Sequence, residues 1–188
     1  IAGFYGVGAY TSAILSTAAS GRHLGGFSMP VPIGLVGAAL VAGITGWAVA
    51  RICVRLKSDY LAMASIGIAE ILRLVFVNES WLTNGSLGVS RIPRPLSDFT
   101  TGRMSDVVFV GFVWVIVLLV YGATARLYDS PWGRSLRAIR DNEASALAAG
   151  KNVEKYRIQT FVIGCAVMGV AGGLSAHYFR FLSPTATD

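Results

Sequence analysis

Long apolar runs constrain the fold of this chain more than any other feature. A helix needs roughly 20 mostly apolar residues to cross the hydrocarbon core of a bilayer. At such lengths only helices satisfy their own backbone hydrogen bonds in lipid, whereas a barrel would show alternating segments of about ten residues. The sequence therefore predicts an all-α, polytopic transmembrane helix bundle with about five spans. The runs are 1–19, 31–50, 60–78, 107–125 and 157–179.

The composition agrees with a membrane protein and excludes an ordinary soluble domain. Hydrophobic residues make up 54% of the 188 residues, charged residues make up 14%, and the mean hydropathy is +0.60. The net charge of +6 does not indicate a nucleic-acid partner, because the basic residues are spread over loops and are not interleaved with exposed aromatic side chains. The expected surroundings are the lipid bilayer, with no nucleic acid.

The basic residues are distributed unevenly between two sets of loops. Segments 51–59 and 126–157 together carry ten Lys and Arg residues, whereas 20–30 and 79–106 carry four. Because cytoplasmic loops of membrane proteins are enriched in Lys and Arg, the first pair is predicted to be cytoplasmic. The first span then runs from inside to outside. Segment 79–106 is then an outer loop that docks an external partner, acts as a partial lid, or is a loose linker.

The predicted cytoplasmic loop, 126–157, contains its own helix signals. Ser130 is a good N-cap and Pro131 suits the first helical position, while Asn142 can cap a second short helix that ends at Gly150. Charged residues crowd the same segment, which predicts an ordered platform that contacts another protein. These residues are Arg134, Arg137, Arg140, Asp141 and Glu143.

Small residues recur at four-residue intervals in the second and last spans. In lipid, such a ridge lets the backbone of a neighbouring helix approach closely. We expect the ridges to lie in helix–helix interfaces that are either static or able to slide during gating. The second span carries Gly34, Ala38, Ala42, Gly46 and Ala50, and the last carries Cys165, Gly169 and Gly173 with Gly172 and Ala176 beside them.

One ionisable pair lies at membrane depth, Glu70 and Arg73 in the third span, shortly after Gly67. Their spacing places them on one helix face, where they can neutralise each other. Charged groups in lipid are costly and commonly face an aqueous path, so a substrate path past Gly67, Glu70 and Arg73 is one hypothesis. The alternative is that the pair fixes the register of the helix.

The histidines and cysteines are not spaced as metal ligands. Cys53 and Cys165 are predicted to be packing residues. His23 and His177 fall near the outer ends of spans and are predicted to be interfacial side chains, with a proton relay as the alternative. No metal site is predicted.

No catalytic or ATP-binding motif is evident. The glycines of segment 6–11 lack the third glycine of a dinucleotide fingerprint and the Gly-Lys-Ser/Thr of a P-loop. The spans contain no HExxH, GxSxG or paired Asp motif. The chain is therefore predicted not to be an enzyme and to take any energy from a partner. Because it starts at Ile1 inside an apolar run, we expect a single membrane domain, 1–188, truncated at both ends.

Recognisable motifs occur along nearly the whole chain. They are Phe4-Tyr-Gly-Val-Gly-Ala-Tyr-Thr11; Ser58-Asp-Tyr-Leu-Ala62 leading to Gly67-Ile-Ala-Glu-Ile-Leu-Arg73; Leu82-Thr-Asn-Gly-Ser86 with Ile92-Pro-Arg-Pro95; the segment from Ser130 to Glu143; and Ala148-Ala-Gly150, Ala176-His-Tyr178 and Ser183-Pro184. In this order they resemble the LivM-type permease subunits of branched-chain amino-acid ABC importers.

The resemblance implies that the cytoplasmic loop is the coupling element that inserts into a cleft on an ATPase subunit. The loop departs from the Glu-Ala-Ala-x-x-x-Gly pattern of ABC importers, because it has Glu-Ala-Ser at 143–145 and its glycine falls one residue late. The coupling residues so implied are Arg134, Arg137, Arg140, Asp141, Glu143, Ala148 and Gly150.

The resemblance also implies a set of partners in the bacterial inner membrane. They are a second, paralogous permease chain, two ABC ATPase subunits that bind ATP and Mg, and a periplasmic solute-binding protein on the outer face. No cofactor is expected in this chain itself. The alternatives are a related permease for urea or short amides, and an ATP-independent channel or facilitator.

Overall fold

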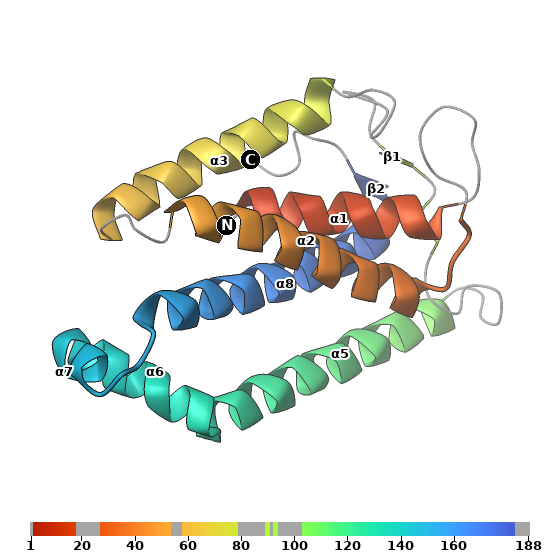
Figure 1. The fold of residues 1–188 in the computed structure, drawn as a ribbon. Coiled ribbons are helices and arrows are strands. Elements are labelled where there is room, and N and C mark those ends of the chain that lie inside the picture. Colours follow the sequence, from red (N-terminus) through yellow and green to blue (C-terminus); the bar gives the residue numbers. More distant parts are fainter. Residues whose placement is uncertain are drawn as a thin grey trace.

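The computed structural model describes residues 2–17, 27–53, 58–78, 89–90, 92–93 and 103–182 (Figure 1). Within these residues the regular structure is helical apart from two strands of two residues each. The prediction of an all-α fold is confirmed. The elements are α1 (Ala2–Ser16), α2 (Val31–Cys53), α3 (Ser58–Asn78), β1 (Val89–Ser90), α5 (Arg103–Asp129), α6 (Pro131–Asp141), α7 (Glu143–Ala148), α8 (Val153–Phe179) and β2 (Phe181–Leu182).

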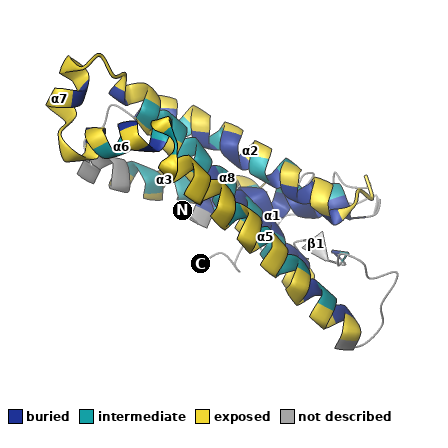
Figure 2. Ribbon diagram, turned by 90° about the horizontal axis from the view of Figure 1, so that it is seen from below, coloured by how far each residue is buried: buried dark blue, intermediate teal, exposed yellow. Residues whose placement is uncertain are grey.

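Helices α1, α2 and α8 pack together as the centre of the bundle (Figures 1 and 2). Glycines bring α1 and α8 together backbone to backbone. A Cβ atom on Gly8 would collide with the backbone of Gly169, and one on Gly172 would collide with the carbonyl oxygen of Tyr5. Between helices in lipid, such close backbone contact is a main source of association, and it joins α1 to α8 here.

The two ridges of small residues lie in the interface between α2 and α8. Gly169 of α8 lies against Ala38 and Ala42 of α2. Cys165 of α8 lies against Gly46. Both cysteines are free and buried, in agreement with a packing role. All five ridge residues of α2 are buried: Gly34, Ala38, Ala42, Gly46 and Ala50.

Three helices within the described residues are long and apolar enough to cross a membrane: α2, residues Met104–Asp129 of α5, and α8. The other two predicted runs are also helical, as α1 and α3, but neither is among the three. The structure therefore supports three of the approximately five spans expected from the sequence.

The helices run alternately between two ends of the bundle (Figure 1). One end holds the C-terminal ends of α1 and α8 and the N-terminal ends of α2 and α5. The opposite end holds α6 and α7, between the end of α5 and the start of α8. We call the α6–α7 end the inner end, because the loop predicted to be cytoplasmic lies there, and we call the opposite end the outer end.

At the outer end, part of the predicted outer loop is fastened to the bundle. β1 pairs antiparallel with β2, with Val89 opposite Leu182. Ile92 is 2% exposed and lies in an apolar cluster with residues of α1 and α8, including Tyr10 and Ala176. The described residues of this segment, 89–90 and 92–93, therefore lie against α1, α8 and β2.

Helix α5 has few partners within the chain. Only 6% of the apolar stretch of α5 is buried inside the structure, against 44% of the corresponding stretch of α2. Figure 2 shows α5 largely in the colour of exposed residues. Large apolar side chains such as Trp114, Leu118 and Leu119 are exposed on it. α5 therefore presents apolar surface to lipid or to another protein.

Candidate functional site

The charged platform predicted from the sequence is present at the inner end as two short helices, α6 and α7. α6 begins where expected. Ser130 has extended backbone and accepts a hydrogen bond from the Gly133 N–H at 3.3 Å, and Pro131 follows as the first helical residue. A Cβ atom on Gly133 would collide with the carbonyl oxygen of Tyr128. Close backbone contact therefore sets the turn from α5 into α6.

Helix α7 is closed at both ends by local hydrogen bonds. Asn142 ends α6 and caps α7, where its side chain accepts from the Ser145 N–H at 3.0 Å. At the other end Gly150 has a φ of 74°, and its N–H and that of the next residue donate to carbonyl groups of α7 at 2.9 and 3.0 Å. This pair of bonds is the Schellman arrangement that ends helices at a left-handed glycine. The caps and the stop predicted from the sequence are confirmed.

Side chains fasten this inner platform, residues 130–152, to α8. Ile139 of α6, Ala146 of α7 and Val153 of α8 form a buried apolar cluster. The indole N–H of Trp132 donates to the side-chain oxygen of Gln159 at 2.9 Å. An apolar contact and a hydrogen bond at separate points therefore fix α6 and α7 relative to α8.

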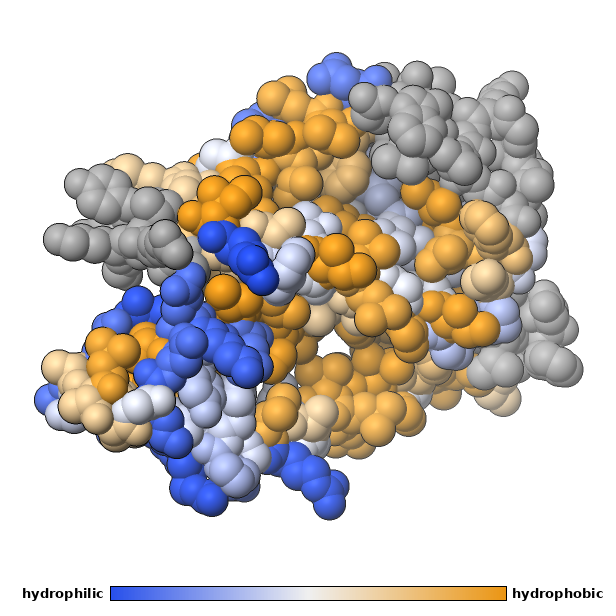
Figure 3. Space-filling view, in the orientation of Figure 1, coloured by the Kyte–Doolittle hydropathy of each residue, from blue (hydrophilic) through white to orange (hydrophobic). Residues whose placement is uncertain are grey.

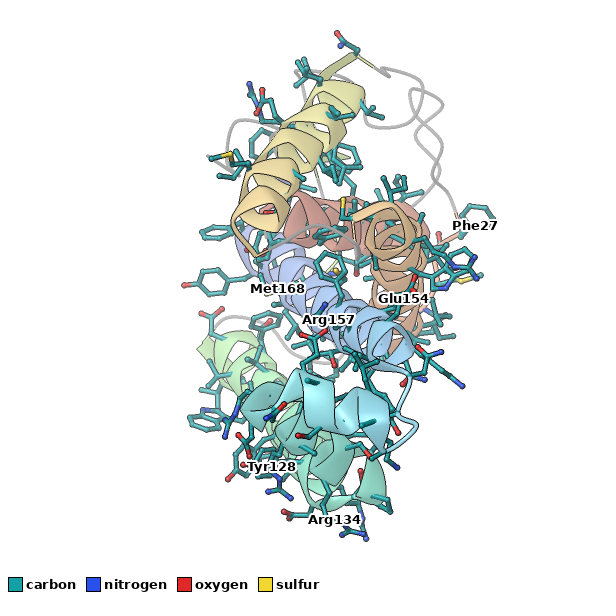
Figure 4. All side chains as sticks on the ribbon, turned by 60° about the vertical axis from the view of Figure 1, so that its left-hand side comes forward. Phe27, Tyr128, Arg134, Glu154, Arg157 and Met168 are labelled. Carbon is teal, nitrogen blue, oxygen red and sulfur yellow. The ribbon has the colours of Figure 1, made fainter. Side chains whose placement is uncertain are left out.

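Two of the predicted coupling residues are held by partners within the chain. Glu143 pairs with Arg157 of α8, with Oε2 and Nη2 2.8 Å apart. The guanidinium of Arg137 lies 4.5 Å from the ring centroid of Tyr128 at the end of α5. Figure 4 shows Arg157 on α8 at the side that faces the platform. These contacts brace the platform against both α8 and α5.

The other predicted coupling residues are exposed. Arg134 lies at the edge of the platform, where its guanidinium donates to the last carbonyl group of α5 at 3.3 Å (Figure 4). Arg140 and Asp141 form an exposed ion pair at 3.3 Å. Ala148 and Gly150 are exposed at the end of α7.

Sequence reasoning missed Leu147, which is 55% exposed on α7. α7 buries only Ala146, so its neighbour in the sequence is directed to solvent. Leu147, Arg140 and Asp141 are all exposed on the platform, whose surface is therefore apolar in part and charged in part, as protein interfaces commonly are. Within the described residues, no three His, Cys, Asp or Glu side chains gather as metal ligands would. The exposed charged and apolar side chains of the platform are suited to contact with another protein.

The ionisable pair of α3 is formed, and it lies on an exposed face. Arg73 donates to the Glu70 carboxylate at 2.9 Å, and the two side chains are 34% and 53% exposed. A Cβ atom on Gly67 would meet nothing within 4 Å. α3 contacts the bundle mainly through α1. The pair is therefore directed away from the interface of α1, α2 and α8.

A buried polar contact at the outer end was not predicted. His177 is fully buried, with Nε2 2.9 Å from Ser12 Oγ and Nδ1 2.7 Å from the carbonyl oxygen of Pro93. Because a carbonyl only accepts, Nδ1 carries the proton, and in the neutral imidazole Nε2 then accepts from the Ser12 hydroxyl. The prediction that His177 is an interfacial side chain is wrong, because α1 and residues 92–93, which we call the outer segment, cover it. His23 lies outside the described residues.

This contact joins three parts of the chain that are distant in sequence. Ser12 belongs to α1, Pro93 to the outer segment and His177 to α8, and Ile92 packs beside them. We call these four residues the outer clasp. A lone histidine near a span end carries no sequence signal for such a role.

Comparison with known proteins assigns the chain to a family. Residues 1–188 match the family model described as the permease component of branched-chain amino acid transport systems. The chain belongs to this family. Its members are permease components, and with three candidate spans among the described residues the chain is a multi-pass membrane protein.

Curated relatives support the same assignment. The high-affinity branched-chain amino acid transport system permease protein LivM of Escherichia coli K12 is 30% identical, over 97% of this chain and 46% of the relative. A probable LivM of Methanocaldococcus jannaschii is 36% identical, over 77% of this chain and 42% of the relative. LivH of Escherichia coli K12 is 25% identical, over 96% of this chain and 60% of the relative. The predicted LivM-type resemblance is confirmed.

The chain spans about half the length of the curated LivM relatives it matches. No solved structure matches it.

Proposed function

We propose that the chain forms the core of a permease subunit of an ATP-driven ABC importer for branched-chain amino acids. The family match and the names of the LivM and LivH relatives support this function. The observation that carries it is the inner platform. Two self-capped helices present exposed charges and Leu147 at the end of the bundle that is richest in Lys and Arg. Such a surface suits a cytoplasmic protein partner rather than lipid.

The proposed partners follow from this function. Two ABC ATPase subunits bind ATP and Mg, so this chain needs no cofactor of its own. A paralogous permease completes the translocation path, and a periplasmic solute-binding protein docks on the outer face. The complex lies in the bacterial inner membrane, with 126–157 in the cytoplasm and 79–106 outside. α1 and α3 join the three candidate spans as membrane helices of a single domain over 1–188.

The proposed mechanism is alternating access. ATP binding closes the ATPase dimer and displaces the platform, and the contacts of the platform with α5 and α8 pass the displacement to the spans. The small-residue ridges of α2 and α8 allow these helices to shift against each other. Arg137 and Glu143 act by bracing the platform. The residues proposed to contact the ATPase are Arg134, Arg140, Asp141, Leu147, Ala148 and Gly150.

The exposed face of α3 is proposed to line the substrate path. A charged pair is costly in contact with lipid, and Glu70 and Arg73 are 53% and 34% exposed within this chain. A path along Gly67, Glu70 and Arg73 therefore has its opposite wall outside the described residues.

The test uses the full-length permease, assembled with its partners in proteoliposomes. We expect ATP-dependent uptake of labelled leucine and no comparable uptake of labelled urea. Arg140→Asp should lower leucine uptake about tenfold, because it reverses a charge at the proposed ATPase contact. Arg180→Asp makes the same change at an exposed residue of the outer end and serves as the matched control.

Three outcomes would contradict this function. Uptake without ATP would indicate a facilitator. Uptake of urea in place of leucine would indicate the related amide permease. Equal losses in the Arg140 and Arg180 variants would show that the platform has no special part in coupling.

A further inference from the structure

A groove opens at the inner end, beside the exposed face of the platform. Its volume is about 840 Å³. Its walls come from the last turns of α2 and α5, the first turns of α8, and Trp132 of α6. Figure 3 shows the molecule open between α5 and the helices above it, with hydrophilic residues gathered at the inner end. The proposed coupling function makes no use of this groove.

The lining of the groove changes from polar to apolar with depth. Arg51, near the end of α2, and Lys155, near the start of α8, lie at the inner rim. Val162 and Ile163 of α8 lie farther from the inner end. Lining residues of α8 run from 154 to 163, which is about 14 Å along the helix axis. That length reaches from the headgroup layer of a bilayer into its hydrocarbon core.

Two tryptophans lie between the rim and the apolar floor. Trp47 is one turn deeper than Arg51 on α2, and the Arg51 guanidinium lies 4.7 Å from its ring centroid. Trp132 is oriented by its hydrogen bond to Gln159. Tryptophan is enriched at the level where headgroups meet acyl chains. The groove therefore lies at the cytoplasmic boundary of the bilayer.

The rim carries more positive than negative charge. Its cations are Arg51 and Lys155, and its acid is Glu154, which has an interaction partner of its own. The guanidinium of Arg51 lies over the Trp47 ring, and no hydrogen bond joins it to another of the described residues. A guanidinium held over an aromatic ring still has N–H donors in its own plane, which suits it to a phosphate group.

We propose that this groove binds an anionic phospholipid of the inner leaflet. The phosphate lies at Arg51 and Lys155, and an acyl chain follows the apolar floor past Val162 and Ile163. A lipid fits better than a protein helix, because the polar rim and the apolar floor follow each other along the membrane normal, as they do in a lipid. Basic pockets between membrane helices on the cytoplasmic side recognise such headgroups. The proposal needs only membrane insertion and does not rest on the importer function.

The test uses the full-length permease in its native complex, purified in detergent and stripped of lipid. Native mass spectrometry and thermal unfolding are measured with phosphatidylglycerol, phosphatidylcholine and inorganic phosphate. We expect only phosphatidylglycerol to be retained and to raise Tm. In the double variant Arg51→Gln/Lys155→Gln, the affinity for phosphatidylglycerol should fall about tenfold while Tm without lipid is unchanged.

The matched control is Arg126→Gln/Lys151→Gln, which removes two exposed cations of the inner end that lie outside the groove and are not proposed to contact the ATPase. Its affinity for phosphatidylglycerol should stay within about twofold of the unmodified protein. Equal losses in the two double variants would overturn the proposal, as would equal binding of phosphatidylcholine or of phosphate alone. A Val162→Cys variant that crosslinks to a partner subunit and not to a lipid-borne reagent would assign the groove to a protein interface instead.

Discussion

The two ends of the bundle are held together in different ways. At the outer end, the fully buried His177 bonds to Ser12 and Pro93, which are 165 and 84 positions away in the sequence. At the inner end, each cap acts within its own short helix, and the ion pair between Glu143 and Arg157 is about half exposed. The outer end therefore depends on long-range burial. The inner platform has a shape set by local bonds, which leaves its surface available to a partner.

Removal of His177 should have the largest effect on stability. In His177→Ala, the buried Ser12 hydroxyl and the partly buried Pro93 carbonyl both lose their partner, beside a new cavity. We expect the free energy of unfolding to fall by about 3 to 5 kcal/mol. Chemical unfolding in detergent micelles measures this loss. Tyr178→Ala, at a neighbour that is 55% exposed, is the control and should lose far less. Similar losses of unfolding free energy in both variants would mean that the outer clasp contributes no more to stability than an exposed neighbour does.

A smaller loss is expected when Ile92 is shortened. Ile92 is 2% exposed, so Ile92→Ala removes packed methyl groups and should cost about 2 to 4 kcal/mol. Hydrogen exchange should also rise at β1 and at the outer end of α8, while α6 and α7 keep their protection. Phe181→Ala, at a half-exposed position of β2, is the control. A rise in exchange at both ends of the bundle would contradict the separation described above.

At the inner end, the backbone of Gly150 should matter more than the nearby charges. Gly150 has a φ of 74°, in the left-handed region that a β-branched residue avoids. Gly150→Val therefore strains the backbone at the C-terminal end of α7 and should lower the free energy of unfolding by about 1 to 2 kcal/mol. Gly150→Asn is the matched variant, because asparagine tolerates the left-handed region, and it should lose much less. Thermal unfolding compares the two. Equal stability of the Val and Asn variants would count against a backbone role.

The ion pair of the platform should have the smallest effect. Glu143→Gln should change the free energy of unfolding by less than about 1 kcal/mol, because water and salt screen a half-exposed pair. A double-mutant cycle with Arg157→Gln measures the coupling energy, which should shrink as salt is raised. A coupling energy as large as the loss in His177→Ala would remove the contrast between the two ends.

Features with local causes could be predicted from the sequence, and features that join distant residues could not. Ser130, Asn142 and Gly150 each act on groups within about one turn, so the boundaries of α6 and α7 followed from residue type and spacing. The helical class followed from the length of the apolar runs. The partners of His177 come from α1 and from the outer segment, and no residue close to His177 in the sequence indicates that these two parts of the chain meet it.

The same reasoning explains the charged residues of the platform. Their number and spacing were evident, but which of them face outward depends on where α5 and α8 lie. Arg137 is held by Tyr128 of α5 and Glu143 by Arg157 of α8, so neither acts as a freely exposed charge. Leu147 became a candidate only when α7 was seen to bury its neighbour.

The close contact at Gly133 suggests that α5 and α6 move together as one bent unit. A Cβ atom there would collide with the carbonyl oxygens of residues 127 and 128, so the start of α6 packs directly against the backbone of the last turn of α5. α5 has 27 residues and is about 40 Å long. A tilt of about 5° at the bend therefore moves the far end of α5 by about 3.5 Å. A rotation that is small at the inner end therefore becomes a displacement about the size of a methyl group at the outer end.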